Sequence, residues 1–112
     1  FHSPLMAPAA EALRPHLEAA DLCDAMVPVV SNVDAVSRCD AEGIKQALIA
    51  QVTQSVRWED SVRRMIADGV EVFIELGPGT VLSKMIPRID DSVAAYSVGT
   101  LAEVYAALEL LG

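Results

Sequence analysis

The stretch VEVFIELGPGTVL, residues 70–82, decides the fold of this 112-residue chain. Apolar residues alternate along Val70 to Leu76, which predicts a strand with one inward face. Gly77-Pro78-Gly79 then predicts a turn into a helix, which Pro87 is expected to close. The inward face of the strand should carry Val70, Val72, Ile74 and Leu76.

A second strand and helix follow in the same order. Val93 to Val98 has the composition of a buried strand. Thr100 and Glu103 have the spacing of a capping box, which predicts the start of a last helix. The alternation of strands and helices predicts an α/β fold with a mostly parallel sheet and helices on its faces. The residues of the last helix expected to face inward are Leu101, Val104, Tyr105, Leu108 and Leu111.

Upstream of this stretch, the sequence pattern predicts three more helices and a short strand. Ser3 and Pro4 indicate the start of a helix that Pro15 should kink or end. Residues 26–30 predict a strand, which Pro28 confines to an edge, a strand start or a bulge. Helices should then run from Asp40 to about Val52, and from about Trp58 to a left-handed cap at Gly69.

The composition excludes several classes of function. The net charge is −8, from 16 acidic and 8 basic residues, and an acidic surface repels the phosphates of nucleic acid. No apolar stretch is long enough for a membrane span, and no signal peptide is recognisable. Cys23 and Cys39 lack the spacing of metal ligands, so we expect reduced thiols in a cytoplasmic protein with no metal site. The first residue is Phe1 rather than Met, which suggests a portion upstream.

Two polar residues are candidates for chemistry. His2 lies on a loop just before a helix cap, where a histidine is either an ordinary surface residue or a proton carrier. Gln51 projects onto the apolar side of its helix near the C-terminal end. Its amide is either solvated at the helix edge, satisfied in the core, or close to a site where its backbone carbonyl could accept a bond from an imidazole. The chain contains no Gly-x-Ser-x-Gly motif, so a complete serine triad is absent.

The Gly77-Pro78-Gly79 turn has two interpretations. A glycine-rich turn between a strand and a helix is typical of phosphate cradles. Pro78, however, removes one of the N–H donors that a cradle needs. We therefore favour a structural turn.

Five segments, taken in order, resemble the malonyl-CoA:acyl carrier protein transacylases of fatty-acid synthesis and the related acyltransferase domains of polyketide synthases. Each segment alone is a common pattern, but their order along most of the chain matches that of the family. The segments are Phe1–Met6, Val27–Val33, Leu48–Gln51, Val56–Trp58 and Glu75–Leu82.

The resemblance implies a serine–histidine acyltransferase that carries a malonyl group from malonyl-CoA, its substrate, to acyl carrier protein without a further cofactor. His2 aligns with the catalytic histidine, the general base and then the general acid. Gln51 aligns with the residue whose backbone carbonyl orients that histidine. Phe1 stands where related polyketide acyltransferases carry Phe when they select malonyl over methylmalonyl groups.

The resemblance also implies that other parts of the catalytic site belong to an upstream portion of the protein. The nucleophilic serine, the arginine for the malonyl carboxylate, the oxyanion hole and a ferredoxin-like small subdomain are all upstream of the histidine in the family. Residues 1–112 should therefore be the C-terminal part of the α/β-hydrolase-like large subdomain, inactive alone and a partner of the N-terminal portion. Two alternatives stay open, a non-catalytic interaction domain with the same fold and a portion of a polyketide-synthase acyltransferase domain.

Overall fold

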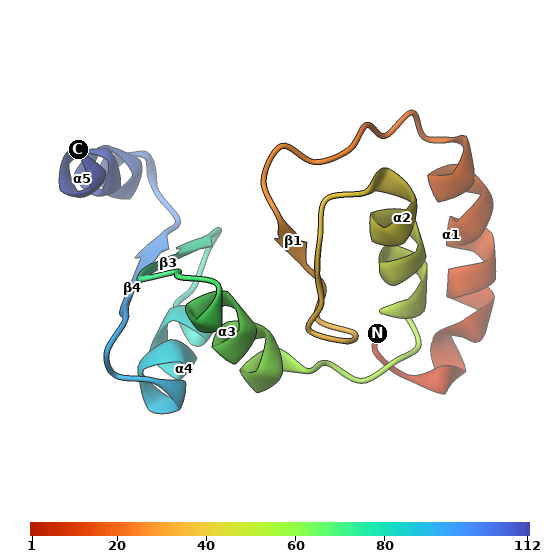
Figure 1. The fold of residues 1–112 in the computed structure, drawn as a ribbon, viewed down its shortest axis with the longest axis horizontal. Coiled ribbons are helices and arrows are strands. Elements are labelled where there is room, and N and C mark those ends of the chain that lie inside the picture. The colour runs from red at the N-terminus through yellow and green to blue at the C-terminus, as the bar shows by residue number, and fades with distance from the viewer. The chain divides into compact units, whose positions relative to one another are not determined.

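The computed structural model describes all residues from Phe1 to Gly112 and divides them into two units, Phe1–Arg64 and Met65–Gly112. The first unit contains helices α1 and α2 and a short antiparallel strand pair, and the second contains a parallel strand pair with a helix on each side (Figure 1). Helix α3, Trp58–Ala67, begins in the first unit and ends in the second.

The first unit opens with a short 3-10 turn, Pro4–Met6, that leads into α1, Ala7–Ala19. The predicted cap is confirmed, because the Ser3 hydroxyl accepts a hydrogen bond from the Leu5 amide at 3.3 Å. The expectation that Pro15 ends the helix is wrong, since α1 continues to Ala19. A proline removes one N–H from the helix, and here α1 packs against α2 and the Lys45 amine donates to the Ala20 carbonyl at its C-terminal end at 2.7 Å.

The strand predicted over residues 26–30 is shorter in the structure and has a partner. β1, Val29–Val30, follows Pro28 directly and pairs antiparallel with β2, Ser37–Arg38. Proline thus stands just before the strand, as its missing N–H requires. The antiparallel partner was not predicted, because two residues are too few to show an alternating pattern.

Helix α2, Ala41–Ala50, supplies much of the core of the first unit. Asp40 caps it as predicted, accepting a bond from the Gly43 amide at 2.6 Å. Gln51 is the C-cap residue, so the helix ends slightly before the predicted Val52. The buried apolar side chains of this region are Ala47, Ile49 and Val52.

Helix α3 is amphipathic and ends at the predicted left-handed cap. Val62 is fully buried at 0% exposure, whereas Arg63 and Arg64 face solvent. Gly69 ends the helix with a φ of 96°, a left-handed conformation that a glycine adopts without steric strain. The amides of Gly69 and Val70 donate to the carbonyls of Ile66 and Met65, which is the paired pattern of a Schellman cap.

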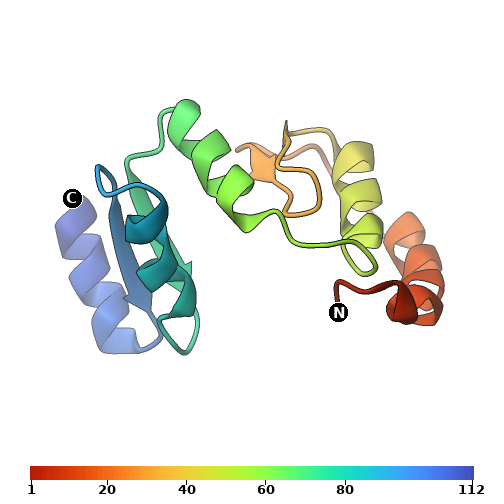
Figure 2. The same cartoon turned by 90° about the horizontal axis from the view of Figure 1, so that it is seen from below.

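The second unit contains the predicted parallel strands. β3, Val72–Leu76, pairs in parallel with β4, Ala94–Val98, from Val72 opposite Ala94 to Leu76 opposite Val98. Helix α4, Val81–Ile89, and helix α5, Leu101–Leu111, lie on opposite sides of these strands (Figure 2). Pro87 does not close α4, because the helix reaches Ile89 and the Asp90 amide still donates to the Ile86 carbonyl at 3.0 Å.

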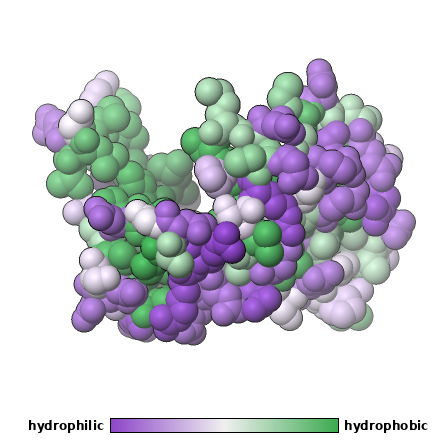
Figure 3. Space-filling model, viewed as in Figure 1, coloured by the Kyte–Doolittle hydropathy of each residue, from purple (hydrophilic) through white to green (hydrophobic).

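Two predicted burial patterns in this unit are wrong. Phe73 is the buried residue of β3, on the strand face opposite to the predicted one, and Leu76 is 80% exposed. None of the five residues of α5 expected to face inward is buried. The reason is that α5 is mostly apolar and β4 is its main contact, so most of its surface has no cover in this chain. Figure 3 shows hydrophobic residues gathered over this helix.

Candidate active site

The backbone of His2 is held by the end of α2. The His2 amide donates a hydrogen bond to the Val52 carbonyl at 2.9 Å. In Figures 1 and 2 the N-terminus accordingly lies beside the C-terminal end of α2. The backbone of His2 and that of Val52, the residue that follows Gln51, are therefore neighbours in the fold.

His2 has a left-handed backbone with a φ of 60°, one of two non-glycine residues with a positive φ. Such a conformation is uncommon for a residue with a side chain, although histidine is among the types enriched there, and strained residues cluster at functional sites. The chain after His2 is fixed by Ser3, whose carbonyl accepts a bond from the Met6 amide at 2.9 Å. The imidazole is exposed, makes no hydrogen bond and is free to meet a further group.

The roles of Gln51 and Phe1 stay predictions, because neither residue forms a contact that would test them. The Gln51 side chain is half-buried and forms no hydrogen bond, while its carbonyl oxygen also accepts none. The bond from the His2 imidazole to this carbonyl is thus not formed in the structure, although its acceptor is available. The Phe1 side chain is 84% exposed, so it does not pack against the neighbouring helix.

The helix end that follows the Gly77-Pro78-Gly79 turn is capped by a side chain of the protein. Gly77 and Gly79 have φ values of 118° and 102°, which explains why glycine stands at both positions. The Glu75 carboxylate accepts bonds from the Leu82 amide at 3.2 Å and the Ser83 amide at 2.8 Å, at the N-terminus of α4. These bonds, led by the one from Ser83, lower the pKa of Glu75. A carboxylate already satisfies this helix end, which supports the structural interpretation of the turn.

Sequence reasoning missed the role of Glu75. The signal was present, since an acidic residue stands at the end of a predicted strand just before a helix N-terminus. Its partners lie across a turn, however, so no short motif of the capping-box kind reveals them.

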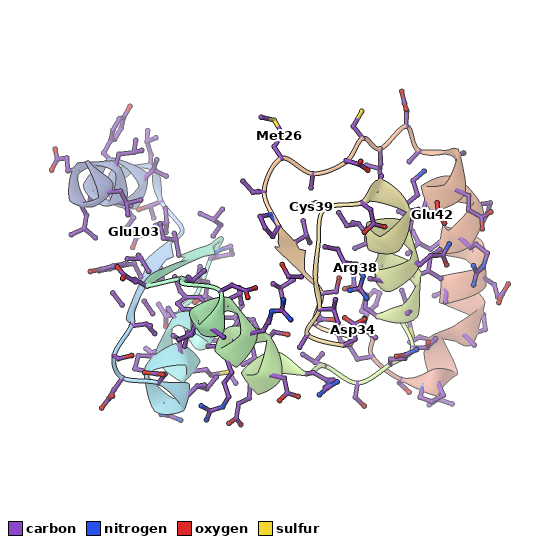
Figure 4. The ribbon with its side chains drawn as sticks, in the orientation of Figure 1. Met26, Asp34, Arg38, Cys39, Glu42 and Glu103 are labelled. Carbon is purple, nitrogen blue, oxygen red and sulfur yellow. The ribbon has the colours of Figure 1, made fainter.

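Other titratable residues form no second site. The Asp34 carboxylate, in the loop between β1 and β2, and the guanidinium of Arg38 in β2 point toward each other (Figure 4), and their hydrogen bond lowers the pKa of Asp34. Cys23 and Cys39 are free, exposed thiols. His, Cys, Asp and Glu side chains nowhere form a group of three that could hold a metal ion. None of the helices has the length and apolar character needed to cross a membrane.

The sequence is similar to curated malonyl CoA-acyl carrier protein transacylases. No model of a protein family matches the chain. The "Malonyl CoA-acyl carrier protein transacylase" of Bacillus subtilis is 42% identical over 111 residues, which cover 99% of this chain and 35% of that protein. The protein of the same name from Escherichia coli K12 is 39% identical over 109 residues. The chain therefore spans about 35% of the length of these relatives.

Solved structures agree with the sequence relatives. The acyl-carrier-protein-S-malonyltransferase of Bartonella henselae superposes with a TM-score of 0.92 at 39% identity, over 100% of this chain and 36% of that one. A malonyl-transacylase solved in complex with a type II PKS acyl-carrier protein has a TM-score of 0.88 at 38% identity, over 97% of this chain and 35% of that one. The parallel pair β3–β4 and the helices around it are thus part of a known α/β architecture.

Proposed function

Because the chain belongs to the malonyl CoA-acyl carrier protein transacylase family, we propose that it is the C-terminal portion of an enzyme that transfers malonyl groups from coenzyme A to the phosphopantetheine thiol of acyl carrier protein. The observation that carries this proposal is the similarity along almost the entire chain, in sequence and in fold. The placement of His2 on the end of α2 supports it, because a proton carrier needs a fixed backbone.

In the proposed reaction the N-terminal portion supplies a serine and His2 moves the protons. The imidazole accepts the serine proton while the serine oxygen attacks the malonyl thioester. The imidazolium then donates that proton to the departing sulfur of coenzyme A, which leaves a malonyl ester on the serine. In the second half the imidazole accepts the proton of the phosphopantetheine thiol, whose sulfur attacks the ester, and returns a proton to the serine oxygen.

Gln51 has an orienting role in this proposal. Its free carbonyl would accept a bond from one ring N–H of His2, which leaves the other nitrogen facing the serine and stabilises the imidazolium as it forms. A backbone carbonyl performs this role with any side chain, so Gln51→Ala should reduce transfer far less than loss of His2. The proton transfers need only the serine and the imidazole, so the proposal includes no cofactor.

The proposed function is tested by His2→Ala in the complete enzyme, residues 1–112 together with the N-terminal portion. Loss of a general acid–base group should lower transfer by about 10²–10⁴-fold while the protein stays folded. His16→Ala is the matched control, because His16 is also exposed but lies on α1, away from residues 51–52 in sequence and without a bond to them. Near-normal transfer in His2→Ala would contradict the role of His2 as the proton carrier, whereas a complete wild-type protein that transfers no malonyl group would favour a non-catalytic interaction domain.

A further inference from the structure

At the C-terminal end of α2, a single backbone carbonyl accepts three hydrogen bonds. The Ala50 carbonyl accepts the amides of Thr53 and Gln54, both at 3.2 Å, and the Thr53 hydroxyl at 3.4 Å. A regular helix would give each of the next carbonyls an amide from four residues further along. Here the chain turns away instead, so the following carbonyls receive no donor from the helix itself.

The two carbonyls that lack a hydrogen bond from the helix are those of Gln51 and Val52. The Val52 carbonyl accepts the His2 amide, and the Gln51 carbonyl accepts no bond. Carbonyls at a helix C-terminus are left without intrahelical partners and are satisfied by other groups. The end of α2 therefore presents adjacent acceptors, and one of them already binds the backbone of the candidate catalytic residue.

The position of these acceptors is fixed by the core. The Val52 side chain is only 6% exposed and belongs to the same buried set as Ile49 and Ala47 of α2. A buried β-branched side chain has few rotamers, so its backbone cannot shift without disturbing its packing. The carbonyl that holds His2 is thus attached directly to a core residue.

We propose that Val52 and Thr53 are positioning residues for His2, an inference that rests on the proposed function. Val52 anchors the carbonyl that fixes the His2 backbone, and the Thr53 hydroxyl and amide hold the turn that releases the Gln51 and Val52 carbonyls. Neither side chain touches a reacting atom. Both act by keeping the imidazole in register with the serine, where a displacement of about 1 Å can reduce the rate by about 100-fold.

The first test compares Val52→Ala with Val62→Ala in the complete enzyme. Both changes remove the same two methyl groups from a buried valine, but Val62 lies on α3 and has no bond to His2. We expect Val52→Ala to lower kcat by about tenfold, with KM for malonyl-CoA unchanged, at a temperature where both variants are folded. Equal kcat values in the two variants, or a loss confined to KM, would overturn the role of Val52.

The second test uses Thr53→Val and Thr53→Ser. Valine has the shape of threonine without the hydroxyl, and serine keeps the hydroxyl. Because that bond is the longest of the three to Ala50, we expect kcat to fall by about threefold in Thr53→Val and to recover in Thr53→Ser. Unchanged kcat in Thr53→Val, or no recovery in Thr53→Ser, would overturn the role of the hydroxyl.

Hydrogen exchange of the His2 amide separates this inference from the proposed function. The bond to the Val52 carbonyl should protect this amide from exchange. We expect the exchange rate of the His2 amide in Val52→Ala to be at least about tenfold higher than in Val62→Ala. If the wild-type enzyme transfers no malonyl group, the proposed function fails, and the exchange rates still decide whether Val52 positions His2. Equal exchange in both variants would refute the positioning.

Discussion

The left-handed backbone of His2 predicts that glycine is more stable than alanine at this position, although neither can transfer a proton. An L-residue in this conformation carries a penalty of about 1–2 kcal/mol, which glycine avoids. Glycine loses about 0.5–1 kcal/mol more conformational entropy on folding. From the mid-values of these two ranges, we expect the free energy of unfolding of His2→Gly to exceed that of His2→Ala by about 0.75 kcal/mol.

The measurement is denaturant unfolding of both variants in the complete enzyme, with one slope of free energy against denaturant concentration used for both curves. Gly69→Ala provides the reference, because a methyl group there would meet no atom within 4 Å and only the φ of 96° opposes it. That variant should be less stable than wild type. If His2→Ala is as stable as His2→Gly while Gly69→Ala is destabilised, His2 is not held in a left-handed conformation, and the inference of a fixed histidine backbone is wrong.

Four further predictions follow from the site and from the exposed surfaces. If Phe1 crowds an α-methyl group, Phe1→Ser should shift the preference for malonyl-CoA over methylmalonyl-CoA by about 1–3 kcal/mol, measured by competition. If the exposed Lys84 and Arg88 of α4 contact the acidic carrier, reversing both charges should weaken carrier binding at low salt, and unchanged affinity would exclude such a contact. Because the pKa of Glu75 is lowered in the folded state, its carboxylate stabilises the fold at pH values above the ordinary pKa of 4.5. This contribution is lost as the pH falls through the lowered pKa, and Glu75→Gln should remove that pH dependence from the free energy of unfolding. Residues 1–112 alone should aggregate and take up no malonyl group from malonyl-CoA, so a monodisperse, cooperatively unfolding chain, or a malonyl adduct detected by mass spectrometry, would argue against a missing N-terminal portion.

The parts of the fold that could be predicted are those whose causes are local. The caps at Ser3, Asp40 and Thr100 each bind an amide within three residues, so a short window of sequence contains both partners. The Schellman cap at Gly69 is equally local. The parallel pair β3–β4 was predictable because alternation, a glycine turn and a helix follow one another without interruption.

The two internal prolines show where local rules fail. Pro15 and Pro87 were expected to disturb or end their helices, yet α1 and α4 continue past them. A proline removes one hydrogen bond, and contacts between elements can offset that loss. The Lys45 amine at the end of α1 is one such contact, and its partners lie in another segment of the sequence.

The sequence alone therefore determined the helix caps and the strand–turn–helix of residues 70–82, and its family resemblance is the source of the prediction that His2 and Gln51 are site residues. Only the tertiary structure decided that Phe73 rather than Leu76 is buried, that Glu75 fills the end of α4, and that the Val52 carbonyl holds a left-handed His2. The reason is physical. A cap depends on atoms a few bonds apart, whereas burial and long-range hydrogen bonds depend on which segments the folded chain brings into contact.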